Sequence, residues 1–111
     1  MATRTLTEAD DRRDVVLHPG DTAVVRLTET PATGHQWTAT VHGSCVVPED
    51  AGFAPPGAAP PGSAAPGAAG TRSFRLRAAA PGMCDVEFRL GRVWETGRSP
   101  ERSVLLHVLV R

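Results

Sequence analysis

The chain has 111 residues with 12 basic and 12 acidic side chains, so its formal net charge is zero. A hydrophobic fraction of 41% and a charged fraction of 22% are ordinary for one globular domain, and the length is too short for two independent cores. The neutral balance argues against a nucleic-acid or anionic-membrane partner, because both kinds of binding depend on a positive field. All 12 basic residues are arginines, which excludes Schiff-base and general-base chemistry by lysine.

The N-terminal residues contain no apolar run of the kind found in a signal peptide. We expect a flexible segment over residues 1–13, one domain over residues 14–111 and a cytoplasmic location. No window approaches the roughly 18–20 consecutive apolar residues of a membrane span, so no membrane partner is expected. The abundance of Ala, Gly, Pro, Arg and Val is typical of a high-GC genome, and we expect a bacterial source.

Short alternating runs separated by Gly and Pro predict strands in the first half of the domain. Ala23, Val25 and Leu27 share one face of a predicted strand, and Trp37 lies on the core-facing row of the next. Four strands are expected here: Asp14–Leu17, Thr22–Thr28, Trp37–Val41 and Cys45–Val47.

The segment Phe53–Gly70 has a different composition. Sixteen of its 18 residues are Ala, Pro or Gly, and five of them are prolines. Proline cannot donate to a sheet ladder and glycine weakens a strand interior, so this segment is predicted to be a long loop.

The second half of the domain again shows strand alternation, with predicted strands at Thr71–Arg77, Cys84–Leu90 and Ser103–Val110. Both rows of the last strand are mostly apolar, so we expect it to be covered on both faces. About seven short antiparallel strands with Gly and Pro turns predict an all-β fold, an immunoglobulin-like β-sandwich.

Cys45 and Cys84 are too few for a disulfide framework, and both fall on apolar strand faces. In antibody domains the first cysteine precedes the buried Trp, whereas Cys45 follows Trp37 by eight residues. We therefore expect buried free thiols, with their pairing left open.

Three connections hold residues that a simple turn does not require. They are Glu29-Thr30-Pro31-Ala32-Thr33-Gly34-His35-Gln36-Trp37, Gly67-Ala68-Ala69-Gly70-Thr71 and Gly91-Arg92-Val93-Trp94-Glu95. Together they resemble the chagasin family of cysteine peptidase inhibitors, whose pattern is Asn-Pro-Thr-Thr-Gly before an aromatic residue and a Trp, then Gly-x-Gly-Gly, then Arg-Pro-Trp. The resemblance runs from Val15 to Val110, and the chain departs from the pattern at Thr30, Ala32, His35, Ala69 and Val93.

The resemblance implies an immunoglobulin-like sandwich whose three loops enter the active-site cleft of a papain-like cysteine peptidase as a wedge. It implies reversible, non-covalent, competitive inhibition by a monomer, with no catalytic residue, cofactor or metal. The residues implied over the catalytic centre of the peptidase are Thr30, Pro31, Ala32, Thr33, Gly34 and His35. Two further sets are implied at the two sides of the cleft. One side is contacted by Gly67, Ala68, Ala69, Gly70 and Thr71, and the other by Arg92, Val93 and Trp94.

The residues of these loops are suited to binding in their own right. Pro31 fixes its own φ and restricts Thr30 to extended conformations, while Gly34 permits a positive φ. A loop restrained in this way loses little entropy on docking. Trp94 is the type of large, rigid side chain that dominates interface energies. At Ala32 the family's hydroxyl is missing, which removes about 0.5–1.5 kcal/mol if that group hydrogen-bonds the target.

Two other classes of function were weighed. An enzyme is disfavoured because His35 and His42 have poor metal-ligand spacing, both cysteines lie in apolar rows and the carboxylates are scattered. The serious alternative is a non-inhibitory protein- or ligand-binding sandwich that uses the same loops, since sandwiches host many functions. The inhibitor hypothesis requires the three loops to gather at one end of the sandwich.

Overall fold

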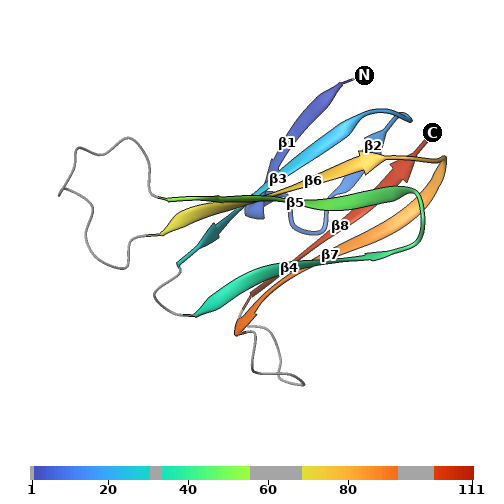
Figure 1. Ribbon diagram of the computed structural model, residues 1–111. Helices are drawn as coiled ribbons and strands as arrows, with labels where there is room; N and C mark the ends of the chain where they lie inside the picture. Colours follow the sequence, from blue (N-terminus) through green and yellow to red (C-terminus); the bar gives the residue numbers. More distant parts are fainter. Residues whose placement is uncertain (1, 31–33, 56–68, 93–101) are drawn as a thin grey trace.

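The computed structural model describes residues 2–30, 34–55, 69–92 and 102–111, which form two packed β-sheets (Figure 1). The strands are β1 (Thr3–Thr7), β2 (Asp14–Leu17), β3 (Thr22–Glu29), β4 (His35–His42), β5 (Val46–Ala54), β6 (Gly70–Ala78), β7 (Gly82–Arg92) and β8 (Arg102–Val110), with a 3-10 turn, η1 (Glu8–Asp10), after β1. No helix in the described ranges is long and apolar enough to cross a membrane.

The first sheet has the strand order β1-β3-β6-β5 and the second has the order β2-β8-β7-β4. Neighbours in the middle of each sheet are antiparallel, whereas the edge strands β1 and β2 pair in parallel with β3 and β8. The predicted β-sandwich is confirmed, although the described residues form eight strands rather than seven and two of the pairings are parallel. The turns at residues 18–21, 43–45 and 79–81 lie at one end, here called the turn end, where both chain termini also lie (Figure 1).

The core is built from the inward rows that the alternation predicted. Leu27, Val86 and Phe88 are completely buried, and the Phe74 and Phe88 rings, one from each sheet, lie 5.3 Å apart between centroids. Trp37 is only 1% exposed, which confirms its predicted place in the core. On β8 the inward row is buried as expected, but the outward residues are only half-buried. The expectation that β8 is covered on both faces is therefore wrong.

The N-terminal residues 3–10, expected to belong to a flexible segment, form β1 and η1 instead. Leu6 is buried against the core, and a capping box closes η1. In this box Asp10 accepts the Thr7 N–H at 2.8 Å, and the Thr7 hydroxyl accepts the Ala9 N–H at 3.3 Å. Glu8 also pairs with Arg102 of β8. One apolar side chain and one cap thus order a segment that looked polar in the sequence.

Strand β5 extends further than the sequence predicted. It continues from Val46 through Pro48 to Ala54, so Phe53 is a strand residue and the connection to β6 begins after Ala54. Pro48 is tolerated because β5 is an edge strand of the first sheet. Gly70, predicted as the last loop residue, is the first residue of β6.

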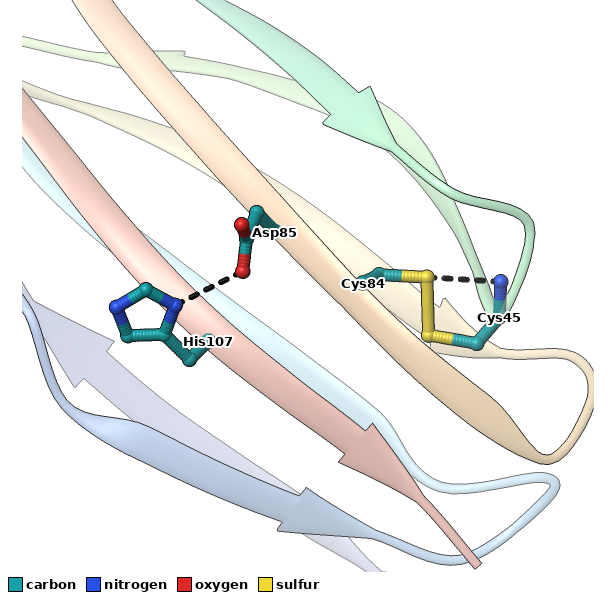
Figure 2. The surroundings of a disulfide bond; sticks show 4 residues. All are labelled: Cys45, Cys84, Asp85 and His107. Carbon is teal, nitrogen blue, oxygen red and sulfur yellow. Dashed lines mark hydrogen bonds and ion pairs between the residues drawn. A yellow bond between two sulfur atoms is a disulfide. The ribbon is translucent and has the colours of Figure 1, made fainter.

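Cys45 and Cys84 form a disulfide, so the expectation of free thiols is wrong (Figure 2). Cys45 directly precedes β5 of the first sheet, and Cys84 lies on the inward face of β7 in the second. Packing the two sheets brings their Cα atoms to 6.0 Å, although they are 39 residues apart in the chain. The Cys45 N–H also donates to Cys84 Sγ at 2.8 Å. Strand faces alone do not reveal which inward residues meet across a sandwich.

The carboxylate of Asp21 ties the turn end to the N-terminus. It is 8% exposed, and its two oxygens accept the backbone N–H groups of Ala2 at 2.8 Å and His18 at 2.9 Å. These hydrogen bonds, the Ala2 bond first, lower the pKa of Asp21 below its ordinary value of 3.8. The carboxylate therefore stabilises the fold above about pH 4, and this contribution is lost as the pH falls through the lowered pKa.

For the variant Asp21→Asn we expect a lower free energy of unfolding at pH 7, because the two N–H groups are accepted by different carboxylate oxygens and the amide replaces one of these with an NH2 donor. The difference from the natural chain should shrink as the pH falls below about 4, because Asp21 is then protonated in the unfolded chain and its deprotonation on folding costs free energy. Urea unfolding at several pH values measures this. A difference that stays constant with pH would contradict the assigned role of the charge.

Candidate functional site

The ends of the strands that flank the three predicted loops lie side by side, at the end of the sandwich opposite the turn end. Within the first sheet Glu29 is paired with Gly70, and Ala54 is paired with Thr71. Within the second sheet His35 is paired with Arg92. We call this region the loop end; its described residues are Glu29, Thr30, Gly34, His35, Ala54, Ala69, Gly70, Thr71, Arg92 and Arg102 (Figure 1).

Seven of the predicted binding residues belong to the described part of the chain: Thr30, Gly34, His35, Ala69, Gly70, Thr71 and Arg92. The other seven lie outside the described residues: Pro31, Ala32, Thr33, Gly67, Ala68, Val93 and Trp94. Gly34 has a φ of 75°, in the left-handed region that favours glycine, as the sequence predicted. Thr30, Gly34 and His35 are each half-buried.

Gly70 occupies a position that has no room for a side chain. A Cβ atom there would lie 2.3 Å from Cζ of Phe53 and 2.4 Å from the carbonyl oxygen of Ala54, both in β5. The sequence suggested that glycine here permits a close approach to a peptidase. The structure supplies a reason within the chain itself, because this glycine lets β6 pass against β5 at the start of the second loop.

A buried ion pair lies directly beneath the loop end. Glu29, the last residue of β3, is only 3% exposed, and its Oε2 accepts a hydrogen bond from Nη2 of Arg72 at 2.9 Å. Nε of Arg72 lies 3.3 Å from each oxygen of the same carboxylate, so the contact is bidentate. Hydrogen bonding to Glu29, with smaller help from Asp50, raises the pKa of Arg72 above its ordinary value and keeps it charged.

The same carboxylate reaches across to the second sheet. Oε1 of Glu29 accepts the backbone N–H of Trp37 at 2.9 Å, and the indole N–H of Trp37 donates to the carbonyl of Thr28 at 2.8 Å. Trp37 is the third residue of β4, which follows the first loop. Both ends of that loop are therefore attached to Glu29.

Sequence reasoning did not single out Glu29 or Arg72. A signal for both was present: Glu29 continues the inward row of Ala23, Val25 and Leu27, and Arg72 continues the row of Phe74. A charge in an apolar row needs a partner, and these two inward rows belong to neighbouring strands. The pair could have been inferred once β3 was known to neighbour β6.

Two observations concern the titratable side chains of the described residues. These residues contain no group of three or more His, Cys, Asp or Glu side chains arranged to hold a metal ion. Asp85 and His107 form a hydrogen bond of 2.8 Å on the outer face of the second sheet, where their side chains are 54% and 43% exposed (Figure 2).

Comparison with known proteins decides the family. The sequence profile of the chagasin family peptidase inhibitors, I42, matches residues 16–108, which is most of the chain. The chain belongs to the chagasin family of peptidase inhibitors. The predicted family is thereby confirmed, and so is the prediction that this protein is not an enzyme, because the members of this family are inhibitors. Among curated proteins no match was found.

Solved structures agree on the fold. A cysteine protease inhibitor from Entamoeba histolytica is similar with a TM-score of 0.83 and 26% identity, over 100% of this chain and 97% of that one. Amebosin is similar with a TM-score of 0.71 and 20% identity, over 100% and 99% of the two chains. PbICP-C, solved in complex with falcipain-2, has a TM-score of 0.64 and 13% identity, over 98% and 89%. These similarities place the chain in a chagasin-like sandwich.

Proposed function

We propose that this protein is a reversible, non-covalent, competitive inhibitor of papain-like cysteine peptidases. The observation that carries the proposal is the loop end. In a chain of the chagasin family, the strand ends beside all three predicted loops converge at one end of the sandwich. The Entamoeba histolytica neighbour is described as a cysteine protease inhibitor, which supports the same class of target.

Each loop has a role in this proposal. Residues Thr30–His35 cover the catalytic Cys–His pair of the peptidase and block the substrate without being cut. Residues Gly67–Thr71 contact one wall of the cleft, and residues Arg92–Trp94 contact the other, with Trp94 as the main anchor. At the loop end the strands beside the loops are paired with their neighbours, so the bases of the loops are rigid. Rigid bases support this arrangement because they reduce the entropy lost on docking.

The partner in this proposal is a single papain-like peptidase, and the inhibitor acts as a monomer from a bacterial source. The Cys45–Cys84 disulfide is of a kind typical of oxidising compartments, which argues against the cytoplasmic location expected from the first residues. That location stays a prediction.

The test is a titration of papain against a fluorogenic peptide with the purified chain, at two substrate concentrations. We expect an apparent inhibition constant in the nanomolar to low micromolar range that rises with substrate concentration, as competition requires. Trp94→Ala should raise the inhibition constant about 30-fold, which corresponds to about 2 kcal/mol. The matched control is Met83→Ala at the turn end, whose side chain is 80% exposed, and it should leave inhibition unchanged.

Two outcomes would contradict this function. The first is no inhibition at about 100 micromolar of papain and of two cathepsin-like peptidases, a level at which binding of even about −5 kcal/mol is detected. The loops would then serve a binding module with another partner. The second is inhibition that does not depend on substrate concentration, because this would place the contact outside the active-site cleft.

A further inference from the structure

The ion pair between Glu29 and Arg72 joins the strand ends of two different loops. Glu29 ends β3 just before the first loop, and its carboxylate also holds the Trp37 N–H on the far side of that loop. Arg72 is the third residue of β6, directly after the second loop. The pair therefore connects the bases of both loops through side chains, in addition to the strand pairing of Glu29 with Gly70.

Arg72 extends this connection to the strand that precedes the second loop. Its Nη1 lies 3.3 Å from Oδ2 of Asp50, and its guanidinium carbon lies 5.6 Å from the centre of the Phe53 ring, both in β5. Arg72, which follows the second loop, thus contacts two residues of the strand that precedes this loop. The Arg72 side chain is 15% exposed and that of Glu29 is 4% exposed, so their ion pair is weakly screened by solvent, whereas the Asp50 side chain is 47% exposed.

Stability alone is a poor explanation for a charge at this position. The rest of the inward row of β3 is apolar, and well-packed apolar side chains in place of a buried ion pair are often neutral or stabilising. An apolar side chain at position 29 would pack, but it could not accept the Trp37 N–H or orient Arg72. What the charged pair adds is a specific geometry between β3, β4, β5 and β6.

We propose that Glu29 and Arg72 are positioning residues that hold the described bases of the first and second loops in one fixed relative orientation, ready for the peptidase. This inference rests on the proposed inhibitory function. It predicts that disrupting the pair weakens inhibition through the loops, beyond any effect on the stability of the sandwich. Neither side chain itself needs to touch the peptidase, because Glu29 and most of Arg72 are buried.

The test compares three variants with the natural chain: Glu29→Gln, Arg72→Met and the double variant Glu29→Leu with Arg72→Met. Each single variant leaves a buried partner unsatisfied, and we expect the inhibition constant for papain to rise at least about tenfold. The double variant should regain most of the thermal stability, because its core position is apolar. Its inhibition should stay weakened by a similar factor, since leucine at position 29 cannot accept the Trp37 N–H.

A stability control comes from the other end of the sandwich. Val110→Ala removes buried methyl groups at the turn end, where Val110 is 1% exposed and pairs with Gly82. It should lower the melting temperature but leave the inhibition constant unchanged. If the double variant recovers inhibition together with stability, or if Glu29→Gln inhibits like the natural chain, the positioning role is overturned.

Hydrogen exchange separates this inference from the proposed function. Backbone amides of residues 34–37 and 69–72 should exchange faster in Glu29→Gln, while those of residues 82–86 at the turn end keep their protection. This result is expected whether or not the natural chain inhibits papain. A natural chain that fails to inhibit contradicts the proposed function, whereas unchanged exchange at the loop end contradicts the positioning role.

Discussion

Replacing Gly70 with alanine is expected to weaken inhibition at least about tenfold and to lower the free energy of unfolding by about 1–3 kcal/mol. The added Cβ would lie 2.4 Å from the carbonyl oxygen of Ala54 and 2.3 Å from the Phe53 ring. The ring can move, but the carbonyl belongs to the backbone of β5, so β5 and β6 must separate. Since Ala54 and Gly70 bound the second loop, the loop base changes shape together with the strands.

Gly91→Ala is the matched control for this substitution. Gly91 also lies at the loop end, in β7 beside Arg92, but a Cβ atom there would meet nothing within 4 Å. We expect its inhibition constant and its melting temperature to stay close to those of the natural chain. Both variants should be measured by papain titration and by thermal unfolding. If Gly70→Ala behaves like Gly91→Ala, β5 and β6 tolerate the extra atom and the second loop base is not rigid.

Removing the disulfide with the double variant Cys45→Ala and Cys84→Ala is expected to cost about 2–4 kcal/mol of stability. The bond closes a loop of 39 residues and joins the two sheets, so its loss frees a large part of the unfolded chain. For a domain of this size, that change corresponds to a melting temperature lower by about 10–20 °C. Inhibition at room temperature should be unaffected, because both cysteines lie at the turn end.

Thermal unfolding with and without reductant measures the effect, and the double variant provides the control. Reductant should lower the melting temperature of the natural chain and leave that of the double variant unchanged. Alkylation of the protein unfolded in urea without reductant, followed by mass spectrometry, counts the thiols directly, because both cysteines are buried in the folded chain. Two alkylated cysteines in protein purified under oxidising conditions would show that the bond does not form.

Much of the sandwich was predictable because a strand can be recognised from the alternation of apolar and polar residues within its own segment. The alternation over Cys84–Leu90 places four residues on one face, and all four are buried in β7. The loop order was predictable for the same reason, since each loop follows a recognisable strand. Two segments were mispredicted because a local feature mattered more than their composition. The buried side chain of Leu6 and the cap of η1 order the N-terminal segment. The position of β5 at the edge of its sheet allows this strand to continue through Pro48 to Phe53.

By itself, the sequence determined the presence of β2 to β8, which face of most of these strands is apolar and in what order the loops of the chagasin family occur, whereas it missed β1 and most of the length of β5. The tertiary structure alone decided which inward residues meet. Cys45 and Cys84 are 39 residues apart, and Glu29 and Arg72 are 43 residues apart, so only the strand order and the packing of the sheets bring them into contact. Period-two alternation specifies a face but carries no information about the partner strand, and the pairings that shape the loop end depend on that partner.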